Sequence, residues 1–410
     1  MSDSSELRRR LERLSKRRQP QEPQPARRRW SGLPPGEEVP TAYGPAYRIE
    51  RSYPLKQAHG PTELAELLGL APELAADVAG RPALAEVPPQ RLTFLDTETT
   101  GLVGGAGTLV FLVGVGTFTE AAFRVRQYFL RDPGEEPAML EALQNDLDEA
   151  GGFVTFNGQA FDLPLLEIRY RIGLRRDQPL TNRPHLDLLF PSRRLWQSVL
   201  PDCSLGTLER HILGLERAEA DVPGALIPAL YLEYLRSGDA TDMSRVVYHN
   251  AMDVLSLVSL AVQVLGRHRQ EHLPDLSGAE ALAVARWHYN AGRFEPAETA
   301  YRTALSGGSQ PEVRLQTLRR YTFHLKRTGR WGEAVEMWQE WHSLSPEDPV
   351  PCLEIAKYYE WRAGDYDQAQ RWAEAALISL THWDPDWRRD EAWAAVEHRL
   401  RRLIQKLGQG

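Results

Sequence analysis

Cysteine is scarce in this chain of 410 residues, which has two, Cys203 and Cys352, far apart in the sequence. Neither has a metal-type spacing, so we expect reduced, structural thiols and a reducing compartment, most simply the cytoplasm. The sequence also lacks a run of about 18 apolar residues, so we expect no membrane-spanning helix. No apolar stretch follows the arginine-rich N-terminus, and we therefore expect no signal peptide.

Net positive charge is lacking too, because the formal net charge is −7. Taken alone, this argues weakly against a nucleic-acid partner. The arginines are uneven, however, and many lie before residue 30. Residues 1–45 are polar, basic and proline-rich, and they bury too little apolar surface to fold, so we predict a disordered basic arm. The arm is either a tether that contacts phosphates or a solvated tail.

Residues 46–270 are predicted to form one α/β domain. Apolar and β-branched runs predict strands at 91–98, 108–118 and 123–130, followed by strands at 151–156 and 183–189. Helices are predicted at 162–173, 203–214 and 244–266. Three antiparallel-type strands followed by strands that alternate with helices resemble the order in an RNase H-like fold. We therefore predict an α/β domain with an RNase H-like mixed sheet flanked by helices.

Residues 278–407 are predicted to be wholly helical and repetitive. A glycine recurs after 37 and then 35 residues, with an aromatic residue two positions later and an alanine five positions later. The glycine lets the chain turn between two helices, and the alanine lets them pack closely. These units resemble tetratricopeptide repeats, whose period is about 34 residues. The glycines and alanines are Gly292, Gly329, Gly364, Ala297, Ala334 and Ala369.

Two carboxylates, Asp96 and Glu98, end the first predicted strand in LTFLDTETTGL. Being two residues apart, they project to the same side of the strand. Standing alone, such a pair is more often a solvated strand end than a site. Asp162 follows the strand-breaking Asn157-Gly158 pair, where it is a helix N-cap, a metal ligand, or both.

A third element carries YHNAMDVLSLV, in which His249 and Asp253 are four residues apart and share one face of a helix. Asp96, Glu98, Asp162 and Asp253 thus come from three separate elements. Hard oxygen ligands of this kind suit two Mg²⁺ or Mn²⁺ ions. His249 or Tyr248 is then predicted to position or deprotonate the attacking water.

These segments resemble the three motifs of the DEDD exonuclease superfamily. Asp96-x-Glu98 matches the first motif, Asn157…Phe161-Asp162 the second and Asp253 the third. The segments FLDTETTGLVGGAGTLVFLVGVG, FNGQAFDLPLL, HLDLLFPSRRLW, CSLGTLE, DVPGALIPALY and HNAMDVLSL are similar to bacterial YprB-like proteins, which often combine an RNase H-like domain with tetratricopeptide repeats. The resemblance covers about residues 90–265 and implies a 3′-5′ exonuclease acting on nucleic acid.

The third motif departs from the superfamily pattern. Members carry histidine five residues before the aspartate or tyrosine four before it, whereas here Tyr248 is five before and His249 four before. We favour His249 as the base, since it shares a helical face with Asp253 and an imidazole is a common base near neutral pH.

Several neighbouring residues are predicted to contact the substrate. They follow the first carboxylate pair (Thr99, Gly101 and Leu102), precede Asp162 (Asn157 and Phe161), or lie in PSRRLW (Arg193 and Arg194). The two arginines either hold a nucleic-acid backbone or form surface ion pairs. Asp187, at the end of the strand at 183–189, is either an accessory ligand or a residue that orients another.

The leading prediction is a metal-dependent exonuclease that binds a 3′ end of single-stranded nucleic acid and releases 5′-mononucleotides. The helical repeats would then recruit a protein partner or lengthen the nucleic-acid surface. One alternative is a non-catalytic adaptor for nucleic acid or protein that keeps the fold. The other is an RNase H-type endonuclease.

Overall fold

The computed structural model describes residues 31–101, 107–217, 222–306 and 310–408. Its main sheet has seven strands in the order β1-β2-β7-β6-β5-β8-β9. Neighbours from β1 to β5 pair antiparallel, while β5, β8 and β9 are parallel. The strands are β1 (Glu37–Thr41), β2 (Gly44–Pro54), β5 (Leu92–Thr99), β6 (Val110–Phe118), β7 (Ala122–Phe129), β8 (Gly152–Thr155) and β9 (His185–Asp187). The predicted mixed sheet is confirmed.

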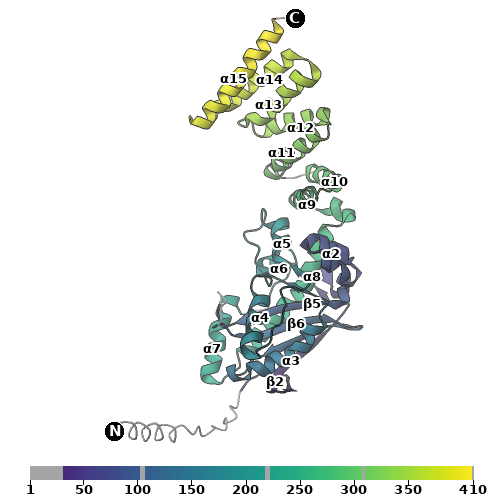
Figure 1. Ribbon diagram of the computed structural model, residues 1–410, viewed down its shortest axis with the longest axis vertical. Helices are drawn as coiled ribbons and strands as arrows, with labels where there is room; N and C mark the ends of the chain where they lie inside the picture. The colour runs from purple at the N-terminus through teal and green to yellow at the C-terminus, as the bar shows by residue number, and fades with distance from the viewer. Residues whose placement is uncertain (1–30, 102–106, 218–221, 307–309, 409–410) are drawn as a thin grey trace, which may run out of the picture.

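Helices cover both faces of this sheet (Figure 1). Alternation along β5 sends Phe94 into one core with Val258 of α8, and Leu95 into a second core with Leu166 of α4. The helices of the domain are α2 (Pro72–Ala79), α3 (Glu136–Glu149), α4 (Asp162–Gly173), α5 (Leu189–Trp196), α6 (Leu205–His211), α7 (Ile227–Ser237) and α8 (Met243–Arg267). The layered arrangement places the ends of β5, β8 and β9 beside α4 and α8.

The predicted disorder up to residue 45 is wrong for residues 37–45. β1 pairs with β2 through Glu37 opposite Arg48, and the same two side chains form an ion pair of 2.6 Å. Pro40 obscures this strand in the sequence, but β1 lies at the sheet edge, where a proline without an N–H donor is tolerated. Residues 1–30 of the predicted arm lie outside the described residues.

Helix α8 is, among the described residues, long and apolar enough to cross a membrane by length and composition alone. However, 78% of its apolar window is buried inside the protein. Val254, Val258 and Ala261 are fully enclosed between the sheet and the neighbouring helices. Its apolar character is therefore that of a core helix, and it fixes the position of every side chain that it carries toward the sheet.

The C-terminal region consists of helical hairpins that stack away from the sheet (Figure 1). Gly292, Gly329 and Gly364 lie between the helices of successive hairpins with φ of 74°, 77° and 69°, a left-handed conformation that favours glycine. The helices are α9 (Gly278–Asn290), α10 (Phe294–Leu305), α11 (Pro311–Arg327), α12 (Trp331–Leu344), α13 (Pro349–Tyr358), α14 (Tyr366–Thr381) and α15 (Trp387–Leu407). The predicted helical region following the α/β domain is confirmed.

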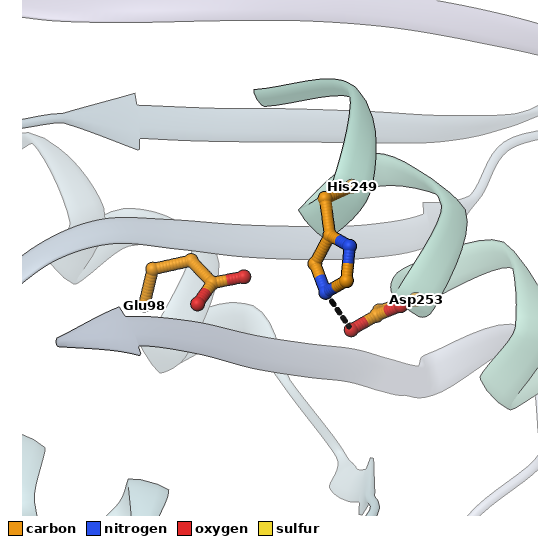
Figure 2. Close-up of side chains that lie close together, drawn as sticks. All are labelled: Glu98, His249 and Asp253. Carbon is orange, nitrogen blue, oxygen red and sulfur yellow. Dashed lines mark ion pairs between the residues drawn. The ribbon is translucent and has the colours of Figure 1, made fainter. Parts of the chain in front are cut away.

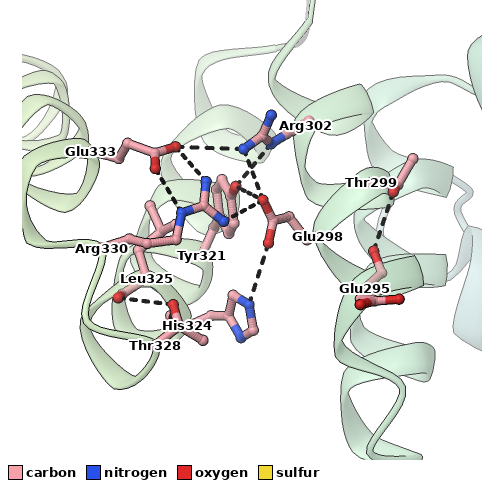
Figure 3. A network of polar contacts seen from close by, with 10 residues as sticks. All are labelled: Glu295, Glu298, Thr299, Arg302, Tyr321, His324, Leu325, Thr328, Arg330 and Glu333. Carbon is pink, nitrogen blue, oxygen red and sulfur yellow. Dashed lines mark hydrogen bonds and ion pairs between the residues drawn. The ribbon is translucent and has the colours of Figure 1, made fainter.

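Polar networks join successive hairpins. Glu298 on α10 accepts from Arg302 at 2.8 Å and from Tyr321 on α11 at 3.2 Å, and it also pairs with Arg330 (Figure 3). Arg330 in turn pairs with Glu333 at the start of α12. One carboxylate therefore links three helices, which holds adjacent hairpins in a fixed orientation.

Candidate active site

The first carboxylate, Asp96, lies near the end of β5 on the face covered by α8. Asn250 of α8 donates its side-chain amide to Asp96 Oδ2 at 2.7 Å. Gln127 of β7 donates to Asn250 Oδ1 at 2.8 Å and to the Val247 carbonyl at 2.7 Å. Because the amide oxygen of Asn250 is held by Gln127, its NH₂ group is directed at Asp96. The carboxylate is thus positioned by two buried amides.

Two glycines of β6 allow α8 to come this close. A Cβ on Gly114 would overlap the Asn250 amide, and a Cβ on Gly116 would overlap Val254 and Phe123. Gly114 lies directly opposite Asp96 in the antiparallel register. The Val-Gly-Val-Gly sequence of β6 is therefore a close-approach surface that brings α8 down onto the carboxylate strand.

His249 and Asp253 project from α8 toward Glu98 of β5 (Figure 2). The three residues each offer one ligand atom, and these atoms lie within 4.8 Å of one another. His249 Nε2 lies 3.5 Å from Asp253 Oδ2. The one-turn spacing on the helix thus brings an imidazole and a carboxylate to the same point as the strand carboxylate.

Asp162 begins α4 on the other side of β5. It is buried, with 6% exposure, and accepts a hydrogen bond from the Thr97 hydroxyl. Because β5 alternates, Thr97 faces α4 while Asp96 and Glu98 face α8. The candidate residues therefore come from three elements, β5, α4 and α8, which meet at the end of β5.

Burial and neighbouring charges raise the pKa values of carboxylates at this site. Burial raises the pKa of Asp96 well above its usual value, and the charges of Asp253, Glu98 and Asp162 raise it further. Burial also raises the pKa of Asp162 to about 6, against the bond from Thr97, and raises the pKa of Asp253. Such a cluster is costly to ionise without a cation. Its carboxylate oxygens suit a hard divalent ion such as Mg²⁺ or Mn²⁺.

An arginine that the sequence analysis missed also enters this cluster. Arg217 pairs with Asp253, and its Nη1 lies 2.7 Å from His249 Nδ1. Glu209 of α6 holds the same guanidinium through bonds of 2.7 and 2.8 Å. Ser256 of α8 donates to Glu209 at 2.6 Å and lies 2.9 Å from His59 Nε2. A polar chain therefore runs from the N-terminal region to the candidate ligands.

Comparison with known proteins agrees with this architecture. Residues 93–265 match the RNase_H superfamily. The uncharacterized protein YprB of Bacillus subtilis (strain 168) is 33% identical over 344 residues, which cover 80% of this chain and 79% of YprB. The chain belongs to the YprB family. An RNase H superfamily domain with an acidic cluster supports a nuclease-type activity in this YprB-family protein.

A solved structure is also similar. The family B DNA polymerase from the hyperthermophilic archaeon Pyrobaculum calidifontis matches this YprB-family chain with 16% identity and a TM-score of 0.32. The match covers 58% of this chain and 30% of the polymerase chain. The chain thus spans less than a third of that polymerase.

Asp187 orients a loop of the YprB-family domain. Its carboxylate accepts from the backbone N–H of Asn157 at 2.8 Å, of Gln159 at 3.0 Å and of Leu189 at 3.1 Å. Asn157 adopts a positive φ of 67°, which an asparagine tolerates better than most residues. Asp187 therefore fixes the turn that leads into Asp162 and joins it to the start of α5.

Tyr248 and His249 point to different surroundings. His249 lies in the carboxylate group, whereas the charge of Tyr248 influences the pKa of Tyr53 on β2. β2 is separated from β5 by two strands. Of the two exchanged residues of this YprB-family member, His249 is the one that the fold brings to the carboxylates.

The remaining predicted substrate residues are dispersed. Thr99 donates to the Gly101 carbonyl at 2.7 Å and closes the turn after β5, while Leu102 lies outside the described residues. Phe161 is half-buried against the core beneath α4. Arg193 and Arg194 are exposed on α5 and line a cleft toward α9. None of the residues lining that cleft belongs to the carboxylate cluster of this YprB-family protein.

Proposed function

We propose that this protein is a metal-dependent 3′-5′ exonuclease that hydrolyses phosphodiester bonds of single-stranded nucleic acid with two Mg²⁺ or Mn²⁺ ions. The observation that carries the proposal is that Asp253, Glu98 and Asp162 lie close enough to Asp96 for their charges to raise its pKa. Four carboxylates from three elements that disfavour one another's ionisation are the arrangement that bound cations relieve. The proposal places the protein in the DEDD superfamily.

The carboxylates are proposed to hold the cations, which when bound supply the charge that activates a water and stabilises the leaving 3′ oxygen. His249 is proposed to accept the proton of the water. Arginine only donates, so Nδ1 of His249 accepts from Arg217 and the imidazole proton lies on Nε2, beside Asp253. In this arrangement His249 gains a free nitrogen only when Arg217 moves away. Tyr248 remains the second candidate for this role.

Substrate contacts are proposed around this centre. Asn157 and Phe161 flank the turn into Asp162, and the part of the Phe161 side chain that is exposed is proposed to stack on a terminal base. Thr99, at the end of β5, is proposed to contact the substrate together with Gly101 and Leu102, which follow it in the sequence. Arg193 and Arg194 are proposed to hold the nucleic-acid backbone, for which their exposed guanidinium groups are suited.

The helical hairpins are proposed to be tetratricopeptide-like repeats that recruit a protein partner or extend the nucleic-acid surface. We place the protein in the cytoplasm, in keeping with its two free, buried cysteines, Cys203 and Cys352. A reducing compartment would leave both thiols in this state.

A non-catalytic adaptor is the second candidate, and one observation favours it. Arg217 neutralises Asp253 from within the chain, which lessens the need for an external cation. An adaptor of this kind would bind nucleic acid or protein without hydrolysis. Calorimetric titration with Mn²⁺ separates the two, since the exonuclease binds divalent ions and the adaptor does not.

The exonuclease is tested with end-labelled single-stranded DNA and RNA in the presence of Mg²⁺ or Mn²⁺. Asp96→Asn keeps the shape of the side chain and should lower the rate by at least about a hundredfold, because loss of groups that only orient metal ligands already costs about 10–100-fold and Asp96 is proposed to be a ligand itself. Asp177→Asn, which alters an exposed carboxylate, should retain the parent rate. Equal rates for Asp96→Asn and the parent would refute the assignment. Cleavage of a circular single strand would indicate an RNase H-type endonuclease instead.

A further inference from the structure

A cleft of about 630 Å³ separates α5 of the sheet domain from α9 and α11 of the hairpins. Three arginines line it, Arg193 and Arg194 from α5 and Arg286 from α9. Arg320 of α11 lies near Arg286, because its positive charge lowers the pKa of Arg286 in addition to burial. The described residues that line the cleft include no carboxylate. A chain with a net charge of −7 thus gathers positive charge at the junction of its two regions.

The lining residues share helical faces. On α5, Phe190, Arg193, Arg194 and Gln197 are spaced as neighbours on one side of a helix. On α9, Ala283, Arg286 and Asn290 have the corresponding spacing. Each wall of the cleft is therefore one continuous helix face, and the two faces oppose each other.

These arginines differ from most others in the hairpins, which are paired. Arg293, Arg314 and Arg319, for example, each contact a carboxylate. In the described part of the chain, no ion pair is formed by Arg193, Arg194, Arg286 or Arg320, and all four are exposed. The positive charges of Arg286 and Arg320 repel each other, and a polyanion bound beside them removes that repulsion.

The walls of the cleft are fixed before any ligand binds. Trp196 of α5 donates its indole N–H to Glu280 of α9 at 2.9 Å, and Arg267 of α8 contacts the same carboxylate at 2.5 Å. The apolar core under α8 continues without interruption into α9 and the first hairpins. Figure 1 shows α5 at the end of the sheet domain that meets the hairpins. A preformed cleft binds without the entropic cost of ordering its walls.

The chemistry of the lining favours single-stranded nucleic acid over an acidic peptide. Phe190 is 53% exposed on the same α5 face as the arginines, so its ring is open to stacking on a base. Gln197, Asn290 and Gln316 add amides that can donate to and accept from base edges. An acidic peptide would use the arginines but neither the ring nor the paired donors and acceptors.

The position of the cleft connects it with the candidate active site. α5 begins at Leu189, two residues after Asp187, whose carboxylate fixes the turn that leads into Asp162. Phe190 and Arg193 lie on the first two turns of that helix. α5 therefore extends from the turn beside Asp162 to the cleft, where Trp196 contacts Glu280 of α9.

We propose that the cleft between α5 and α9–α11 binds single-stranded nucleic acid, with Arg286 and Arg320 on phosphates and Phe190 stacked on a base. The proposal deepens the proposed function and rests on it for the class of substrate. It assigns the first two hairpins a part in substrate binding, so that they extend the nuclease surface.

The test measures binding of a 5′-fluorescein-labelled single strand by anisotropy in EDTA, where no hydrolysis occurs. The variant Arg286→Glu/Arg320→Glu should weaken binding at least about tenfold. Because each lost phosphate contact on a single strand removes about 0.7 from the slope of log K against log salt, the slope should fall by roughly 1.4. Phe190→Ala should weaken binding about tenfold. The matched control Arg371→Glu/Arg401→Glu changes two exposed arginines on α14 and α15 that form no ion pair with any described residue, and it should stay within about twofold of the parent.

Three results would overturn the inference. The first is equal binding by the Arg286→Glu/Arg320→Glu variant and its control. The second is displacement of the strand by a poly-glutamate peptide at lower concentration than by unlabelled strand, which would assign the cleft to an acidic protein. The third is equal affinity for a blunt duplex. Asp96→Asn should bind the strand without hydrolysing it, so a parent that binds and never cleaves would fail the exonuclease proposal alone. A parent that cleaves while the cleft variant binds normally would fail this inference alone.

Discussion

Arg217 places its guanidinium between Asp253 of α8 and Glu209 of α6, and its second nitrogen contacts His249. One cation thus engages the candidate ligand and the candidate base together. Glu209 is only 2% exposed, so water cannot take the place of Arg217 as its partner. A divalent ion that binds Asp253 must compete with this guanidinium.

Removal of Arg217 should therefore have two opposite effects. In Arg217→Ala the buried Glu209 loses its partner, and we expect unfolding free energy to fall by about 3 kcal/mol, since uncompensated buried charges cost about 3–5 kcal/mol. The double variant Glu209→Gln/Arg217→Ala should recover part of that loss in urea denaturation. The same double variant should bind Mn²⁺ more tightly than the parent by calorimetry. Weaker Mn²⁺ binding would show that Arg217 supports the ion site and does not compete with it.

Gly114 determines how closely α8 approaches the carboxylate strand. Gly114→Ala places a methyl group against the Asn250 amide, so the helix must shift or the Asn250–Asp96 bond must break. Overpacking of this kind costs about 1–3 kcal/mol. We expect that loss in thermal denaturation together with weaker Mn²⁺ binding. Gly332→Ala meets open space at the start of α12 and serves as the control. A Gly114→Ala variant with parental Mn²⁺ affinity would show that ion binding does not depend on how closely α8 approaches β5.

The sequence predicted the elements that carry strong periodic signals. The five strands from β5 to β9 and the helix of Asp162 were recognised because buried runs and a glycine stop are local features. The turns at Gly292, Gly329 and Gly364 were recognised for the same reason, because glycine is the residue that most readily adopts a positive φ. Edge strand β1 was missed because Pro40 suppresses the strand signal, and only pairing with β2 restores it.

The site was predictable in its carboxylates and not in their surroundings. Asp96 and Glu98 can be recognised by their spacing on one strand, and Asp253 by its spacing from His249 on one helix. Asn250 carried a weak signal, a polar residue between His249 and Asp253 that is fully buried in the structure. Arg217 and Glu209 carried none, since they meet Asp253 only through the packing of α6 against α8. Contacts between distant segments depend on tertiary structure that no local pattern contains.

The free energy of unfolding should depend on pH, because the pKa values of the buried carboxylates are raised in the folded state. The pKa of Asp162 is raised to about 6 in the folded state from 3.8, so folding gains stability from its proton. That stability is fully present below about pH 3.8 and is lost as pH rises through about 6, a change on the order of 2–3 kcal/mol. In EDTA, the advantage of the parent over Asp162→Asn should therefore shrink between about pH 5 and pH 7.5. Urea denaturation at each pH measures this difference.

The difference in stability between the parent and Asp162→Asn is the informative quantity, because buried histidines change the stability of each protein in the opposite direction. Burial lowers the pKa of His185 and of His268 to about 4, so they reduce stability as pH falls from about 6.5. They titrate in parent and variant alike and cancel in the comparison. Addition of Mg²⁺ at about pH 7.5 should restore the advantage of the parent and leave Asp162→Asn unchanged. A pH-independent difference would contradict the raised pKa of Asp162.

Glu360 should control the attachment of the last helix. Its side chain is fully buried and accepts from Arg402 at 2.9 and 2.8 Å and from Lys406 at 3.0 Å, and it also pairs with Arg399, all three on α15. Burial alone would raise the pKa of Glu360, but the bonds from Arg402 and Lys406 lower it. Glu360→Gln keeps the shape and removes the charge that three cations share. We expect a loss of about 2 kcal/mol, below the usual range for a buried pair because the cations are partly exposed.

The loss should be local to the end of the chain. Apart from Glu360, α15 is held by a small core in which Val396 and Leu403 are buried. In Glu360→Gln, amide hydrogen exchange should therefore accelerate in α15 while α8 keeps its protection. Glu391→Gln changes an exposed carboxylate on α15 and should exchange like the parent. Because an ion pair weakens with salt, the gap between Glu360→Gln and the parent should narrow at about 1 M NaCl. Acceleration spread evenly over the chain would instead show that α15 unfolds together with the sheet domain.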